Sequence, residues 1–217
     1  MKISYCPSIV LGILFTVTTS QAALINGSFE TGDFSGWVIR DSTPNVLGGH
    51  GVQVQTGGAT DGIYAASSYG FSLELGISFA QDVGILGASS TLSFDYSAFV
   101  NSFDLLRGTD RVFSVTLSPR GGGIPIHTFE IWRGPFGQST SSGAQSVSLD
   151  LSAYVGLDAR VSFDQIGKRD DGASSFTFDN VRLQPTPVPE PATYALTIGA
   201  CLVGFAVWHR RSSKAQS

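Results

Sequence analysis

The chain has 217 residues and a formal net charge of −4 at pH 7, with 42% hydrophobic and 14% charged residues. Between its two terminal segments, residues 23–187 hold nine Lys and Arg against sixteen Asp and Glu, and this length suits a single domain. An acidic domain of this kind lacks the basic surface by which proteins hold nucleic acid or anionic membranes, so both classes of partner are excluded for it.

The N-terminal 22 residues have the pattern of a secretory signal peptide. Lys2 gives a positive start, Ile9 to Val17 form a short apolar core, and Ser20-Gln21-Ala22 place small residues at the cleavage positions. We expect signal peptidase to cut after Ala22, which exports the remainder of the chain.

Both cysteines lie in the terminal segments, Cys6 in the first and Cys201 in the last. The exported domain therefore has no cysteine and can form no disulfide. Its stability has to come from its apolar core or from a bound metal.

Residues 23–184 alternate apolar and polar side chains with a period of two, and glycine-rich turns separate the alternating runs. This period is that of strands with one buried face, and no run sustains a helical stripe. It predicts an all-β fold, an antiparallel two-sheet sandwich, which becomes a jelly roll if the first strand pairs with the last. The clearest runs are 92–98, 113–117, 147–151, 161–164 and 175–178.

The start and the end of this region resemble the galactose-binding-like and carbohydrate-binding-module jelly rolls. Leu24-Ile25-Asn26-Gly27-Ser28-Phe29-Glu30 is similar to their opening strand, and Phe178-Asp179-Asn180-Val181-Arg182-Leu183 is similar to their closing strand. The resemblance implies a structural calcium that ties the two together through Glu30 and Asp179, since calcium prefers carboxylate and carbonyl oxygens. The simpler alternative is that both carboxylates bind the amides of turns.

Candidate ligand residues for a sugar are aromatic and polar. Trp132 ends an alternating run, and Arg133 and Phe136 follow it in a loop. Sugar rings stack on exposed aromatics while neighbouring polar groups bind hydroxyls, so Tyr69 and Gln81 are added to the set. The alternative for Trp132 is an aromatic plug under a loop, and Trp37 is expected in the core.

Catalytic motifs do not occur in the sequence. It contains no Gly-x-Ser-x-Gly elbow, no His-Glu-x-x-His helix and no phosphate loop. A pair of carboxylates could hydrolyse a glycoside, but no pair has a distinctive spacing. We expect no catalytic residue, and no cofactor besides the structural calcium.

The C-terminal segment consists of a Pro-rich linker at 185–191, an uncharged apolar run at 192–208 and a basic tail at 209–217. A helix over the apolar run would be about 26 Å long, near the short limit for one transmembrane helix. Arg210 and Arg211 follow it, and these positive residues are expected to stay in the cytoplasm.

Val188-Pro189-Glu190-Pro191, the apolar helix and the two arginines together resemble the PEP-CTERM sorting signal of Gram-negative bacteria. The same tail is also labelled an ice-binding protein C-terminal region, which names a place on a chain and not an activity. The resemblance implies that a membrane-embedded exosortase reads the Pro-Glu-Pro segment and removes a transient helix. An ordinary membrane anchor is the alternative.

These observations predict an exported protein that begins as a membrane-anchored precursor facing the periplasm and ends at the cell surface or in the extracellular matrix. Its sandwich is expected to bind carbohydrate, such as extracellular polysaccharide, without catalysis. A structural matrix protein with no discrete pocket is the alternative, and a glycoside hydrolase is a third.

Overall fold

The computed structural model describes residues 23–41, 50–70, 74–101, 109–168 and 173–184, together with the single residue Gly199. The predicted signal peptide, the Pro-rich linker, the C-terminal helix and the basic tail lie outside the described residues, apart from Gly199. Within the described ranges, no helix is long and apolar enough to cross a membrane.

The described residues form ten strands and one short 3-10 helix, η1 (Ser152–Tyr154). The strands are β1 (Val38–Asp41), β2 (His50–Gln55), β3 (Ala65–Gly70), β4 (Glu74–Ile85), β5 (Thr91–Val100), β6 (Arg111–Pro119), β7 (His127–Gly134), β8 (Thr140–Asp150), β9 (Asp158–Lys168) and β10 (Ser174–Gln184).

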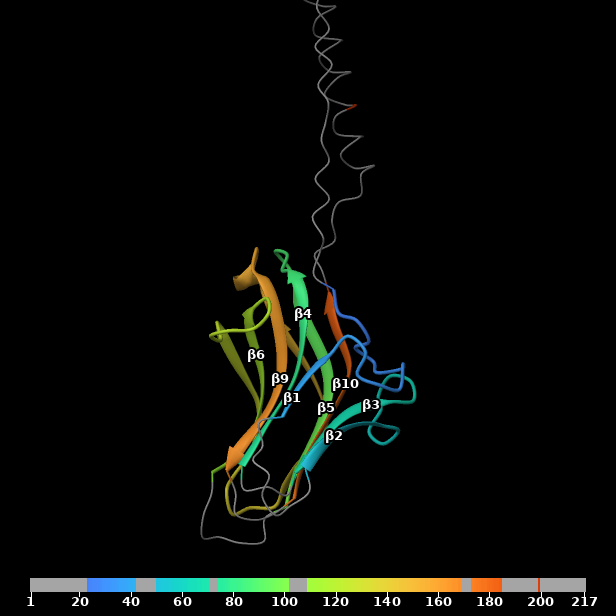
Figure 1. Ribbon diagram of the computed structural model, residues 1–217, viewed down its shortest axis with the longest axis vertical. Coiled ribbons are helices and arrows are strands. Elements are labelled where there is room, and N and C mark those ends of the chain that lie inside the picture. Colours follow the sequence, from blue (N-terminus) through green and yellow to red (C-terminus); the bar gives the residue numbers. More distant parts are fainter. Residues whose placement is uncertain are drawn as a thin grey trace, which may run out of the picture.

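The strands form two five-stranded sheets that face each other in two layers (Figure 1). Sheet A has the order β1-β4-β9-β6-β7 and sheet B the order β2-β3-β10-β5-β8, and every pair is antiparallel. Strands β3 to β10 give the sheet orders β3-β10-β5-β8 and β4-β9-β6-β7, which is jelly-roll connectivity, with β1 and β2 added at the edges. The predicted antiparallel two-sheet sandwich is confirmed.

The opening segment differs from the prediction, because residues 24–29 form turns and not a strand. Asn26 and Phe29 have positive φ angles, 51° and 56°, which an extended strand does not allow. The segment still touches the last strand, where the Val181 N–H donates to the Gly27 carbonyl at 2.9 Å. A Cβ at Gly27 would overlap the Val181 carbonyl, so glycine permits this approach. Strand β10 pairs with β3 and β5, and not with the opening segment.

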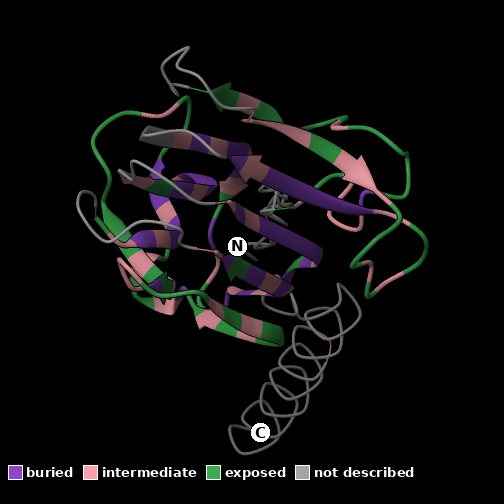
Figure 2. Ribbon diagram, turned by 90° about the horizontal axis from the view of Figure 1, so that it is seen from below, coloured by how far each residue is buried: buried purple, intermediate pink, exposed green. Residues whose placement is uncertain are grey.

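Alternation along the strands sorts side chains between the core and the outside. In β5, Leu92, Phe94 and Tyr96 are buried, whereas Ser93 and Asp95 between them are only partly buried. Figure 2 shows this pattern as buried segments that alternate with partly buried and exposed ones along the strands. The core therefore lies between the two sheets, and each sheet has a second face toward solvent.

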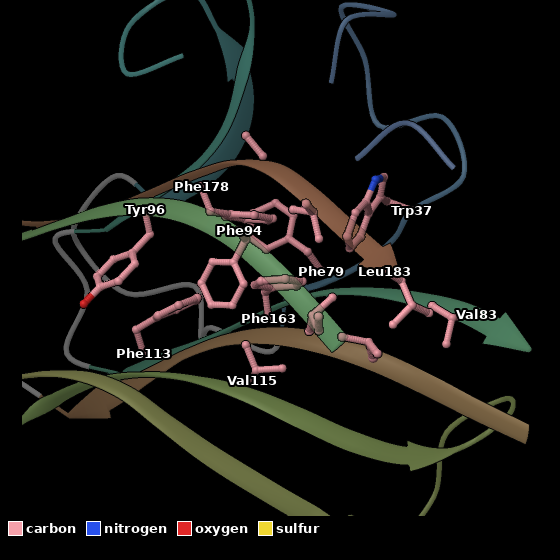
Figure 3. Close-up of a cluster of buried hydrophobic side chains, with 14 of the residues drawn as sticks. Trp37, Phe79, Val83, Phe94, Tyr96, Phe113, Val115, Phe163, Phe178 and Leu183 are labelled. Carbon is pink, nitrogen blue, oxygen red and sulfur yellow. The ribbon is translucent and has the colours of Figure 1, made fainter. Parts of the chain in front are cut away.

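Aromatic rings fill the space between the sheets (Figure 3). The rings of Phe163 and Phe178, one from each sheet, are stacked with centroids 4.6 Å apart and an interplanar angle of 8°. Trp37 packs edge-on against Phe163 at 5.8 Å, and its indole N–H donates to the Asn26 carbonyl at 3.0 Å. Trp37 is 7% exposed, as expected of a core residue.

Candidate functional site

The solvent face of sheet A is hollowed by a groove of about 450 Å³. The period of two that buries Phe113, Val115 and Leu117 of β6 turns Ser114, Thr116 and Ser118 to the opposite face, where they line the groove. Strands β4 and β9 contribute their outward positions in the same way. The groove thus follows from the same alternation that builds the core.

The floor of the groove is made of small side chains, most of which carry hydroxyl groups. Ser114, Ser118 and Ser162 are 3%, 6% and 9% exposed, and Ala80 is 3% exposed, although all four point away from the core. Outward side chains are buried this deeply because they are short and lie at the bottom of a hollow. Thr116 and Thr128 add two hydroxyls on the side of β6 and β7, with their Oγ1 atoms 3.3 Å apart.

One end of the groove holds an ion pair between β4 and β9. Arg160 binds Asp82 through Nε–Oδ1 at 2.6 Å and Nη2–Oδ2 at 3.0 Å, a two-point contact that fixes the plane of the guanidinium. The Gly121 N–H also donates to Asp82 Oδ1 at 3.0 Å. The hydrogen bond from Arg160 lowers the pKa of Asp82, burial opposes this, and the Gly121 amide adds to the lowering. The pair therefore stays ionised.

Arg40 of β1 reaches the same end of the groove. A Cβ placed on Gly122, in the loop between β6 and β7, would lie 3.5 Å from Nη1 of Arg160 and 3.8 Å from both Nη atoms of Arg40. Both guanidinium groups therefore converge beside Gly122, which has a positive φ of 95°. Among the described residues, no carboxylate pairs with Arg40. The sequence analysis did not identify these two arginines as site residues. The sequence feature that could have indicated them is that each lies at an outward-facing position of a strand.

The groove can bind a polar ligand that carries hydroxyl groups. Hydroxyls both donate and accept hydrogen bonds, and a guanidinium donates several in one plane. A volume of about 450 Å³ lies in the range of small-molecule sites. Among the residues that line it there is no aromatic ring, so hydrogen bonds rather than stacking have to hold a ligand there.

The predicted residues of β7 and its following loop lie outside this groove. Trp132 is opposite Phe113 in the register and packs partly buried against the core, as in the alternative of an aromatic plug. Arg133 forms ion pairs with Glu130 and with Asp110, which raise the pKa of its guanidinium. Phe136 is partly buried, and its backbone N–H donates to Asp110 at 2.8 Å.

The other two predicted ligand residues lie elsewhere. Gln81 is 4% exposed, and its side-chain amide exchanges hydrogen bonds with the backbone of Ile25 at 2.6 and 2.9 Å. It holds the N-terminal segment against β4. Tyr69 is on β3 of sheet B, against Gly51 of β2. The structure thus does not bring the five predicted residues into one site, and their role in ligand binding stays a prediction.

The two predicted calcium ligands, Glu30 and Asp179, both accept hydrogen bonds from the loop between β2 and β3. Glu30 Oε1 accepts the N–H groups of Ile63 and Tyr64, both at 2.8 Å. Asp179 Oδ2 accepts that of Asp61 at 2.8 Å. Both carboxylates therefore bind turn amides, as the simpler alternative expects, and within the described ranges no group of three or more His, Cys, Asp or Glu gathers as metal ligands.

Two oxygens in this region have no hydrogen-bond donor, and they fit a cation. Asp179 is 1% exposed, and its Oδ1 is buried without a partner, as is Oδ1 of the next residue, Asn180. A buried carboxylate oxygen without a donor is costly, and a cation would satisfy it. These oxygens and the Glu30 carboxylate are of the kind that calcium prefers.

A third carboxylate, Asp95, borders the same loop. Its Oδ2 accepts the Thr60 hydroxyl at 2.8 Å and the Asn180 side-chain amide at 2.9 Å, and its Oδ1 accepts the Ser146 hydroxyl. Burial would raise the pKa of Asp95, but the hydrogen bonds from Ser146, Asn180 and Thr60 outweigh it and lower the pKa. Asp95 is therefore ionised at neutral pH.

A comparison with protein families identifies the C-terminal signal. Residues 187–211 match the PEP-CTERM protein-sorting motif, the same stretch that the sequence predicted from Val188 to Pro191 and the two arginines. The motif indicates a secreted surface protein that is processed by an exosortase. No curated protein sequence matches the chain.

Solved structures that resemble the fold share little sequence with it. TmCBM61, solved with β-1,4-galactotriose, has 16% identity and a TM-score of 0.49 over 76% of this chain and 99% of its own. The K1 cleaved adhesin domain of Lys-gingipain from Porphyromonas gingivalis W83 has 16% identity and a TM-score of 0.48 over 73% and 96% of the two chains. The enzymatically active domain of the bacteriophage CBA120 tailspike protein 4 has 15% identity and a TM-score of 0.46 over 75% and 21%.

Proposed function

We propose that the exported sandwich binds an extracellular glycan in the groove of sheet A and performs no chemistry on it. The observation that carries this proposal is the groove itself, a hollow of about 450 Å³ whose floor is formed by serine and threonine hydroxyls and whose end carries two guanidinium groups. Such a lining matches the hydroxyl groups of a sugar chain, which donate and accept in turn.

The sorting motif supports the proposal that the protein binds its glycan outside the cell. An exosortase would recognise Pro189-Glu190-Pro191, remove the C-terminal helix and deliver the domain to the cell surface or the extracellular matrix of a Gram-negative bacterium. Signal peptidase would act first at the other end. The precursor would face the periplasm while its transient helix is in the membrane.

A structural calcium ion belongs to the same proposal. Asp179 Oδ1, Asn180 Oδ1 and the carboxylate of Glu30 are the oxygens that would hold it. The ion would place a positive charge beside the carboxylates of Glu30 and Asp179 and would link the N-terminal segment to β10. In a domain without disulfides, such a link adds stability where the segment around Gly27 contacts β10.

Glycan binding is tested with the mature protein isolated from its host and applied to an array that includes the host's own exopolysaccharide. The variant Thr116→Phe fills the groove from β6 with a side chain that strands accept well. We expect it to lower the affinity at least about tenfold, a loss of roughly 1.4 kcal/mol.

The matched control is Ser148→Phe, which places the same ring at an exposed position of β8 in sheet B. It should bind as the wild type does. Equal binding by Thr116→Phe and wild type, or no glycan bound at all, would contradict the proposal. Phe136→Ala in the same assay tests the surface predicted from the sequence, and a loss there alone would favour that surface over the groove.

A further inference from the structure

We infer that the groove selects an acidic polysaccharide and that an anionic group of the glycan, a carboxylate or a sulfate ester, binds beside Gly122 between Arg40 and Arg160. This inference rests on the proposed function and names its ligand class. The anion site occupies one end of the groove, and the hydroxyl floor continues from it toward the remaining sugar units.

The geometry at this end leaves guanidinium donors directed at one position. Asp82 occupies Nε and Nη2 of Arg160, and Nη1 is the atom nearest the space beside Gly122. Both Nη atoms of Arg40, which comes from β1, approach the same space. One oxyanion there can accept hydrogen bonds from both residues, and such charge-assisted bonds are stronger than bonds between neutral groups.

Asp82 acts here as a positioning residue. Its two-point contact fixes the Arg160 plane, and its bond to the Gly121 N–H holds the loop that brings Gly122 over the groove. Gly122 leaves the space open, because a side chain at this position would approach all three guanidinium nitrogens. The site is thus assembled before a ligand arrives.

The charges that face the groove are unevenly placed. Asp82 balances Arg160, while Arg40 has no carboxylate partner among the described residues. The acid among the residues that line the groove, Asp164, lies four positions from Arg160 on β9, about 13 Å along the strand, and accepts the Ser162 hydroxyl. A negatively charged group of a ligand is therefore bound most favourably at the end of the groove that holds the two guanidinium groups.

The charge of the whole domain argues against unspecific attraction. Residues 23–184 hold nine basic and sixteen acidic side chains, so a polyanion is repelled at long range. An acidic glycan can bind only where donors and hydroxyls are arranged for it. Selectivity for sugar over other polyanions is a direct consequence.

The experiment measures the equilibrium binding of the mature protein to polygalacturonate, to the same polymer with its carboxyl groups reduced, to dextran sulfate and to polyglutamate. We expect polygalacturonate to bind at least about tenfold more tightly than its reduced form, as the loss of a charge-assisted contact implies. Arg40→Gln should remove that preference, and Arg40→Lys should keep part of it. Arg182→Gln, on sheet B and paired with Asp61, is the matched control and should change nothing.

Dextran sulfate bound with the same dependence on Arg40 supports the site and assigns it to sulfate esters. Equal affinity for the acidic and the reduced polymer, or wild-type binding by Arg40→Gln, overturns the anion site and leaves glycan binding intact. Polyglutamate bound as tightly as polygalacturonate overturns it too, because the sugar would then contribute nothing. If no polymer binds, the proposed function itself fails.

Discussion

Replacement of Phe163 by alanine tests the core that holds both sheets in place. Phe163 is 0% exposed, and its ring contacts those of Phe178 at 4.6 Å, Phe94 at 5.0 Å and Trp37 at 5.8 Å. Removal of a fully buried phenylalanine ring costs about 3–5 kcal/mol, from lost transfer free energy and from the cavity left behind. Against a total stability of roughly 5–15 kcal/mol, this is a large share. In a domain of this size it lowers Tm by roughly 10 °C.

The assay is urea unfolding of the mature protein, followed by tryptophan fluorescence. Trp37 packs against the ring that is removed and reports directly on it. Phe99→Ala is the matched control, because Phe99 is 42% exposed and its removal should cost less than about 1 kcal/mol. If both variants lose the same free energy of unfolding, the reasoning from the stacked core is refuted. A double-mutant cycle with Phe178→Ala should give a coupling of about 0.5–1.5 kcal/mol.

Three further outcomes follow from the same structure. Gln81→Leu should lower the free energy of unfolding by about 1–3 kcal/mol in urea, because the backbone N–H and carbonyl of Ile25 lose their hydrogen bonds to the Gln81 side chain. Weakened glycan binding at unchanged stability would contradict this. EDTA should lower Tm by roughly 5–10 °C if calcium is held at about 100 times its dissociation constant, and Asp179→Asn should abolish the response; an unchanged Tm counts against the ion. Arg160 lowers the pKa of Asp82 from 3.8, so the ionised pair adds stability above about pH 3.8 that is lost as the pH falls through the folded pKa. Asp82→Asn should therefore be less stable than wild type at pH 7, and the difference should shrink as the pH falls below about 3.8; a difference that does not change with pH would rule out this reasoning.

The sequence predicts those strands in which one face is buried, because burial of one face makes apolar and polar residues alternate. The five clearest alternating runs lie in β5, β6, β8, β9 and β10, because every second side chain of these strands faces the core. The edge strand β1 is mostly exposed and carries no such pattern. The opening segment is expected to be a strand only from its resemblance to the jelly rolls, but Asn26 and Phe29 have positive φ angles and the segment turns, which agrees with its turn-forming Asn-Gly-Ser sequence.

The groove could not be predicted because pairings over long sequence separations create it. Arg160 meets Asp82 only through the register of β9 with β4, and Arg40 arrives through the register of β1 with Ser78. Trp132 was a candidate sugar-binding residue because it is an aromatic residue directly before a loop. Its position opposite Phe113 turns it toward the core instead. The residue types in the sequence suggested a ligand-binding surface with aromatic rings. The pairing of the strands instead places hydroxyl and guanidinium groups together in the groove.

The position of β10 in its sheet affects how the domain would carry mechanical load. β10 is hydrogen-bonded on both sides, to β3 and to β5, and it ends at Gln184, directly before the sorting motif that starts at residue 187. Its inter-strand bonds run perpendicular to its axis. A pull along β10 from an attached C-terminus would therefore load both ladders in shear, whereas the same pull along an edge strand such as β8 would load only one ladder. If the sorted protein stays attached through its C-terminus, any load therefore reaches the domain through an interior strand.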